Sequence, residues 1–517
     1  MLNHLVVALR RRSPDCVIAP SLRAGVAVGV PLVGAMMAGW HHWVAYLALG
    51  SLVALYGKNE PYRRRAGTLT GVGIGLVLAV GAGVWFAGSD THPAARLLMI
   101  GVAAAVAKLM CDAGASGPPG GLILGFASAT TAYLPPPVPS VVAVFAATSA
   151  GALFAWVVCM CGWVFDPWGP ARVAVANALR CAAAISRSDE DRARHTAALA
   201  AHSGWLALAA SRPRRAGVHG MLVRLNAAAE SVVLNPASPD TARGHQLESA
   251  ASRILRRRPP NLPDLPAPPF LNAFTDSPGS VMLRSRSMVA ALHPRSLMMP
   301  GAVRVFLGAV VAGGVAQTLH LGHGYWASVT AIAVLSVPSA VASVHRAVQR
   351  TLGTGAGLIL ALLVLSTVSS PLWVSVIVVG CVIVGEIFVV YNYGYGMVWI
   401  TPTAVLLTAL AVPAGPADLT GDRLVATAVG GLVALGCVLA VRNRRSIRAL
   451  ECAIRACEKA VAELRVAEPR GEQQRRKLVP LVAAVRDAYE IVRGEHSIRD
   501  VPDEEVVRRF EREFAYS

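Results

Sequence analysis

The chain has 517 residues, of which 54% are hydrophobic and only 15% are charged, and its mean hydropathy is +0.52. Soluble domains carry about 25% charged residues, and here the apolar residues come in long blocks, so a string of soluble domains is excluded and a polytopic membrane protein is predicted. The net charge of +18 lies mostly beside these blocks, which favours a role in membrane orientation over nucleic-acid binding.

Two apolar blocks predict an all-α membrane protein with about twelve spans of about 20 residues each. The first block, 1–165, divides into spans at 17–39, 43–57, 66–87, 94–112, 119–134 and 140–165. The second block, 300–441, divides into spans at 300–320, 325–343, 351–368, 372–391, 396–413 and 421–441. Each block opens with the same sequence of features, so two pseudo-repeated six-helix units are expected.

Two polar segments complete the chain, at 166–299 and 442–517. Both mix alanine and leucine with charged residues at helical spacing, which predicts soluble helices. A proline-rich run at 256–269 predicts an extended linker within the first segment. We expect the two segments to pack together as a helical bundle.

The basic residues of the loops alternate in a way that sets the orientation. The loops assigned to the outer face contain no lysine or arginine, and they are 40–42, 88–93, 135–139, 321–324, 369–371 and 414–422. The opposite loops and the tail are rich in both, as at 58–65, at 346–350 and at 442–445. Positive residues stay inside, so a multi-pass protein of the cell membrane with both termini and both polar segments in the cytoplasm is predicted.

A smaller pattern, Arg-x-x-x-Thr-x-x-Gly, begins at Arg64, Arg350 and Arg423. Val144 opens the same spacing without the arginine in the sixth span. The pattern favours inverted three-helix repeats within each block, as in many transporters. Threonine and glycine at this spacing also allow helices to pack closely, and the two interpretations are compatible.

The second block carries a set of short motifs. They are Gly324-Tyr325-Trp326-Ala327, Arg346-x-x-x-Arg350-x-x-Gly353-Thr354, Asn392-Tyr393, Thr401-Pro402 and Arg423-x-x-x-Thr427-x-x-Gly430. This set resembles the fusaric acid resistance and aromatic acid exporter superfamily over residues 300–441, and the first block resembles a diverged copy. The resemblance implies two six-span halves and export of aromatic and other weak organic acids.

Function is therefore expected to be proton-coupled export of small aromatic or amphipathic organic acids by a secondary transporter. Its partners would be the organic anion and the lipid bilayer, with a homo-oligomer or an accessory export protein as further partners, and no nucleic acid. A passive organic-anion channel and a membrane scaffold without transport remain alternatives. An enzyme is disfavoured, because no nucleotide-hydrolysis, serine-hydrolase or zinc-protease motif is visible, and no cofactor or metal site is expected.

The candidate substrate-binding residues combine basic, aromatic and polar side chains. They are Arg64, Trp326, Arg346, Arg350, Asn392, Tyr393, Thr401, Pro402 and Arg423. An inner vestibule that concentrates anions could be formed by Arg64, Arg65, Arg346 and Arg350, or these arginines could simply obey the positive-inside rule. The aromatic and glycine turn at 391–396 could form a flexible stacking surface or an interface anchor, and Pro402 could free backbone carbonyls or only kink its helix.

Proton coupling is assigned to Glu386, the acidic residue that lies well inside an apolar span. At 1.5 Å per residue it lies roughly 8 Å from the cytoplasmic end, where an ionisable group usually has a partner and a function. Lys108 holds the equivalent position in the first block, and the two are expected to pair across the pseudo-twofold axis. A structural ion pair, or a Glu386 turned to the cytoplasmic surface, is the alternative.

Overall fold

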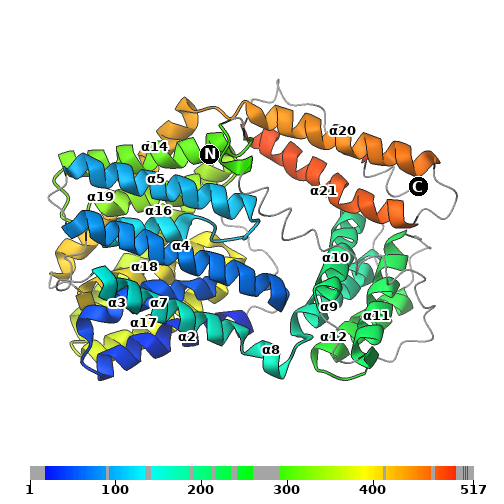
Figure 1. Cartoon of the computed structure of the whole chain (residues 1–517), viewed down its shortest axis with the longest axis horizontal. Coiled ribbons are helices and arrows are strands. Elements are labelled where there is room, and N and C mark those ends of the chain that lie inside the picture. Colours follow the sequence, from blue (N-terminus) through cyan, green and yellow to red (C-terminus); the bar gives the residue numbers. More distant parts are fainter. Residues whose placement is uncertain are drawn as a thin grey trace. The chain divides into compact units, whose positions relative to one another are not determined.

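The structure is a computed structural model, and every regular element among the residues that it describes is a helix (Figure 1). The described residues are 18–88, 92–133, 141–186, 191–211, 216–234, 241–259, 290–294, 296–411, 415–466, 472–495, 505, 507, 509 and 510. They form two compact units. The membrane unit consists of Met1–Lys58, Arg65–Cys161 and Leu283–Asn443, and the second unit consists of Asn59–Arg64, Gly162–Met282 and Arg444–Ser517.

The helices of the membrane unit are long and apolar, and they run side by side in Figure 1. Nine candidate spans are found among the described residues. They are built from α2 (Ile18–Met37), α4 (Tyr62–Gly88), α5 (Pro93–Ala113), α7 (Val141–Met160) with α8 (Gly162–Phe165), α14 (Met299–Thr318), α16 (Ala340–Thr367), α17 (Pro371–Tyr391), α18 (Tyr393–Ala411) and α19 (Pro416–Ala440). The chain is therefore a multi-pass membrane protein, and its described part is all-helical.

Three further apolar helical segments lie where the sequence predicted full spans, but they are too short to cross a bilayer. The first combines η1 (His41–Trp43), α3 (Val44–Ser51) and η2 (Leu52–Leu55), and the others are α6 (Leu122–Thr131) and α15 (Tyr325–Leu335). The 11 residues of α15 extend about 16 Å at 1.5 Å per residue. The hydrocarbon core is about 30 Å thick, so the length of α15 is about half of that thickness.

The boundary between α15 and α16 differs from the prediction. A span over 325–343 was expected, whereas α15 ends at Leu335 and α16 already begins at Ala340. Pro338 cannot donate a backbone hydrogen bond, and the Ser339 side chain accepts one from the Ala342 N–H at 3.3 Å, so it caps α16. The hydropathy window hid this break because the loop has only four residues and lies between apolar residues.

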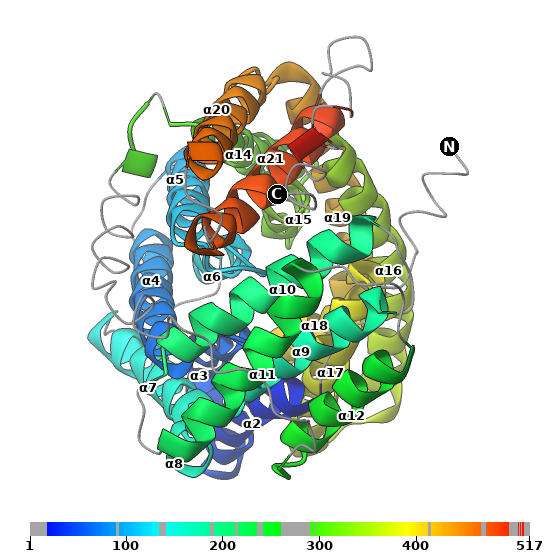
Figure 2. The ribbon, with the colours of Figure 1, turned by 90° about the vertical axis from the view of Figure 1, so that its right-hand side faces the viewer.

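The first helix of each block packs against the fourth helix of the other block. α2 lies on α17, and α14 lies on α5, as the ribbon also shows (Figure 2). Glycine permits the close approach, because a Cβ on Gly29 would lie 2.8 Å from Val379 and one on Gly101 would lie 2.7 Å from Val310. The two blocks therefore interlock through these helix pairs.

The glycines of the Thr-x-x-Gly pattern serve mostly to bring helices together. A Cβ on Gly357 would lie 2.8 Å from the carbonyl oxygen of Val398 in α18, and one on Gly430 would lie 2.7 Å from Thr330 in α15. Gly71 is different, since nothing lies within 4 Å of its Cβ position. The close-packing interpretation thus accounts for two of these three glycines.

Substituting Gly430 with Ala is therefore expected to destabilise the protein. The new methyl would press on α15, and overpacking of this kind costs about 1–3 kcal/mol. The matched control is Gly71→Ala, which adds a methyl in open space and gains helix propensity of about 0.8–1 kcal/mol. Thermal unfolding of both variants in detergent checks this, and an equal effect of the two substitutions would contradict it.

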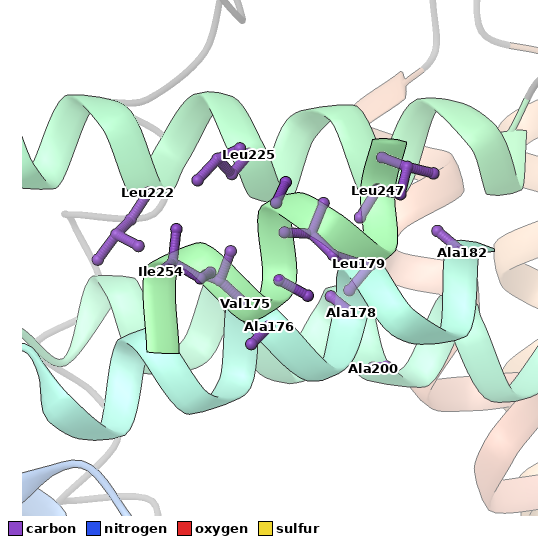
Figure 3. Packing of buried hydrophobic residues seen from close by; sticks show 14 of the residues in the cluster. Val175, Ala176, Ala178, Leu179, Ala182, Ala200, Leu222, Leu225, Leu247 and Ile254 are labelled. Carbon is purple, nitrogen blue, oxygen red and sulfur yellow. The ribbon is translucent and has the colours of Figure 1, made fainter. Parts of the chain in front are cut away.

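The second unit is a helical bundle, and the helices of its core are not among the candidate spans. Its core joins α9 (Gly169–Ile185), α10 (Asp191–Ala209), α11 (Ala216–Leu234) and α12 (Thr241–Leu255), where Leu179, Leu222 and Ile254 interdigitate (Figure 3). From the tail, α20 (Arg445–Val466) packs on α21 (Glu472–Glu495), and α21 contacts α10. The two polar segments therefore form one unit, while the proline-rich run lies largely outside the described residues.

Candidate functional site

Arg350 of α16 is buried with only 4% of its surface exposed. Its Nε donates to Thr330 Oγ1 at 3.3 Å, and its Nη1 donates to the Tyr393 hydroxyl at 2.8 Å. Gly353 brings α16 close enough to α18 for this contact, since a Cβ there would lie 2.7 Å from Met397. Arg350 thus connects α15 and α18 from within the membrane unit.

Arg346 lies one turn earlier on the same helix. Its Cζ lies 3.7 Å from the centroid of the Tyr393 ring, a cation–π contact. Its Nε is buried and has no hydrogen-bond partner. Tyr393 therefore contacts two guanidinium groups, one through its hydroxyl and one through its ring face.

Arg423 approaches from α19. It is 3% exposed, and its Cζ lies 3.1 Å from the centroid of the Trp326 ring. Both Nε and Nη1 lack a hydrogen-bond partner. Arg423 also lies close enough to Arg350 for the two like charges to interact electrostatically. We call the group of Arg346, Arg350, Arg423, Tyr393 and Trp326 the arginine cluster.

The positive charge of the arginine cluster is not neutralised within the described part of the chain. There, none of its three guanidinium groups is in an ion pair with a carboxylate. Asp422 is the neighbour of Arg423, but its carboxylate accepts the His323 backbone N–H at 3.0 Å and contacts the His323 ring at 3.1 Å. Buried charges are costly unless they are paired, so the cluster is suited to an anion that supplies the missing charge.

The chemistry of the cluster fits an organic anion. Guanidinium N–H groups form strong charge-assisted hydrogen bonds with carboxylates. Trp326 and Tyr393 add aromatic surface beside these donors, and Trp326 also stacks with Phe126 of α6 at a centroid distance of 5.6 Å. Phe126 belongs to the first block and was not among the predicted site residues, because no motif pointed to it.

Three of the other predicted site residues, Asn392, Thr401 and Pro402, take part in helix capping and helix packing. The Asn392 side chain accepts the Gly394 N–H at 2.8 Å and so caps α18, whose glycines at 394 and 396 pack tightly rather than forming a flexible surface. Thr401 is fully buried, its hydroxyl has no partner, and together with Pro402 it contacts α16 at Gly357. These residues set the spacing between α16 and α18.

The four arginines of the expected inner vestibule have different surroundings. Arg64 pairs with Glu60 at 3.2 Å, is about half exposed, and belongs to the second unit. Arg65 is buried and donates to the carbonyl oxygens of Gly57 at 2.8 Å and Lys58 at 2.9 Å. Backbone carbonyls therefore hold Arg65, and only Arg346 and Arg350 of the expected set belong to the arginine cluster.

The predicted pair of Glu386 and Lys108 is wrong. Glu386 forms an ion pair with Lys58, whereas Lys108 contacts Asp112 at 2.9 Å and the Ser336 carbonyl oxygen at 3.1 Å. The reason is the interlocked packing, because α17 lies on α2 and α5 lies on α14. Glu386 of α17 therefore contacts the loop after η2 in the first block, and Lys108 of α5 contacts the loop after α15 in the second block.

The comparisons with known proteins match the part of the chain that holds the arginine cluster. Residues 310–437 match the family described as fusaric acid resistance protein-like. The resemblance to the fusaric acid resistance family is confirmed. This segment contains every residue of the cluster, and the family is one of membrane transporters rather than enzymes.

Two relatives extend the comparison. An uncharacterized membrane protein, YvaC of Bacillus subtilis (strain 168), is 23% identical over 513 residues, which cover 92% of this chain and 81% of that protein. The uncharacterized protein slr1298 of Synechocystis sp. (strain ATCC 27184 / PCC 6803 / Kazusa) is 27% identical over 166 residues, which cover 32% of this chain and 22% of that protein. No solved structure matches. The relationship to YvaC extends the likeness beyond the fusaric acid resistance segment to nearly the whole chain.

Proposed function

We propose that the chain is a secondary transporter that exports small aromatic or amphipathic organic anions from the cytoplasm. The observation that carries the proposal is the arginine cluster, in which Arg423 is buried with two unpartnered N–H groups. A membrane protein that only provided a scaffold would gain nothing from uncompensated buried charge. An organic carboxylate would neutralise the cluster through its charge and lie against Trp326 through its apolar body.

The proposed architecture is two pseudo-repeated blocks that face each other around this site. Support comes from the matching pairs α2 with α17 and α14 with α5, and from the short helices that occupy the fifth span of the first block and the second span of each block. Transporters commonly bind substrate near the bilayer midplane beside discontinuous helices. α15 is such a helix, and it carries both Trp326 and Thr330 of the site.

The proposed orientation keeps both termini and the second unit in the cytoplasm, for the charge asymmetry of the loops. A cysteine introduced at position 276, which lies outside the described residues, should be shielded from an impermeant thiol reagent in intact cells. Labelling there would contradict the orientation.

The transport proposal is tested with purified full-length protein in proteoliposomes. Radiolabelled benzoate should cross the membrane faster than in protein-free vesicles, and an imposed proton gradient should drive its accumulation. Flux that is equally fast with and without the gradient would favour the passive channel. No benzoate flux above that of the protein-free vesicles would favour the scaffold.

Coupling is proposed to reside in Glu386, with Lys58 rather than Lys108 as the partner of its carboxylate. Protonation of Glu386 would break the ion pair and release Lys58 for the anion. Inward movement of a proton would thus be coupled to export of the anion. The Glu386→Gln variant should remain folded and still bind benzoate, but its transport should no longer respond to a pH gradient. Unchanged proton-driven export by this variant would end the coupling proposal.

A further inference from the structure

The ion pair between Lys58 and Glu386 is part of a larger group of charges in the first block. Lys58 lies in the turn between η2 and α4. Its carbonyl oxygen accepts hydrogen bonds from Arg65 Nη2 at 2.9 Å and from Arg23 Nη2 at 3.3 Å. The turn is thus held in place by α2 and α4, while the Lys58 ammonium points to a carboxylate from the second block.

The positive charges at this turn exceed the negative ones. Lys58 contacts the carboxylate of Glu386, while Arg23 lies beside Lys58 through its bond to the Lys58 carbonyl oxygen and has no ion pair among the described residues. The Nε of Arg23 is buried without a hydrogen-bond partner. If the Glu386 carboxylate leaves, Lys58 loses its counter-charge beside a second cation, and a free anion becomes the favourable replacement.

The Lys58 ammonium is more exposed than Arg350 and Arg423 of the arginine cluster. The Lys58 side chain is 24% exposed, so water and small ions reach its ammonium. The backbones beside it are held by close packing of α2 on α17, where a Cβ on Gly29 would lie 2.8 Å from Val379. An anion can therefore replace the carboxylate by a side-chain movement of Glu386, without separation of the two helices.

We propose that Lys58 and Arg23 form a second anion site, and that the Glu386 carboxylate occupies it at rest as a tethered substitute for a free carboxylate. The ligand is a small monovalent carboxylate, because it replaces the single negative charge of one glutamate side chain. The role of this site rests on the proposed export function, in which the anion would bind at this turn before it reaches the arginine cluster. Its binding chemistry stands on the charges at this turn and is independent of the arginine cluster.

The test counts bound benzoate by equilibrium dialysis of full-length protein in detergent. The wild type should bind one benzoate, at the arginine cluster, because Glu386 competes at Lys58. Glu386→Gln vacates the second site and should bind two. The double variant Glu386→Gln with Lys58→Met should return to one, and Glu386→Gln with Arg423→Met should also bind one, at Lys58.

The outcomes separate this inference from the proposed function. Wild-type binding without a second benzoate in Glu386→Gln would overturn the inference and leave the arginine cluster intact. A different pattern would support the inference and overturn the role of the cluster. In that pattern the wild type binds no benzoate, Glu386→Gln binds one, and the double variant with Lys58→Met binds none. If Glu386→Gln fails to fold, Glu386→Asp keeps the charge on a shorter tether, and it should bind a second benzoate at higher concentration. A single site in Glu386→Asp at saturation would then overturn the inference.

Discussion

Replacing Arg423 with Met is expected to raise the melting temperature of the anion-free protein and to abolish its stabilisation by benzoate. Arg423 is 3% exposed, and its Nε and Nη1 have no hydrogen-bond partners. Replacing a buried ion pair with apolar side chains of similar size is often neutral or stabilises a protein by about 1–4 kcal/mol. Arg423 has no carboxylate in an ion pair with it in the described part of the chain, so a similar gain is expected. The contact with Trp326 offsets part of that cost in the wild type, so the lower half of this range is expected.

Loss of the guanidinium should weaken benzoate binding at the same time. Hydrogen bonds to charged groups contribute about 1.5–3 kcal/mol each, which corresponds to roughly ten- to a hundredfold in affinity. Thermal unfolding in detergent with and without benzoate measures both effects. Arg444→Met, at an exposed basic residue of the second unit, is the control and should change neither quantity. A lower melting temperature of anion-free Arg423→Met would show that Arg423 is a structural group.

Replacing Arg350 with Ala is expected to reduce benzoate transport at least tenfold and also to destabilise the protein. Unlike Arg423, Arg350 has partners, since it donates to Thr330 and Tyr393. Leaving a buried polar partner unsatisfied costs about 1–3 kcal/mol. The two arginines should thus change the melting temperature in opposite directions, although both substitutions reduce anion binding.

Arg350→Lys distinguishes the charge of Arg350 from its geometry. Lysine keeps the charge but lacks the planar fork that reaches two partners at once, so transport should be intermediate between those of the wild type and Arg350→Ala. Uptake by proteoliposomes with equal amounts of folded protein provides the measurement, with Arg444→Ala as the control. Equal transport by Arg350→Ala and Arg444→Ala would remove the support for an arginine-based anion site.

The sequence predicted the class of the protein and named all five residues of the arginine cluster as candidate site residues. Long apolar stretches and short basic loops are local features, so a window of about 20 residues detects them. The motifs at Trp326, Arg346, Arg350, Tyr393 and Arg423 were found as short patterns that resemble a known family. The contacts among these side chains could not be predicted from those patterns, because the residues lie on four different helices, α15, α16, α18 and α19.

By itself, then, the sequence determined that the chain crosses the membrane many times, and it identified the basic and aromatic residues that the second block contributes. Only the tertiary structure decided the partners of the charges: Glu386 with Lys58, Lys108 with Ser336, and Asp422 with His323. The physical reason is that hydropathy and charge are read along the chain, whereas an ion pair depends on which helices touch. That choice is made by shape, as where Gly29 of α2 admits Val379 of α17.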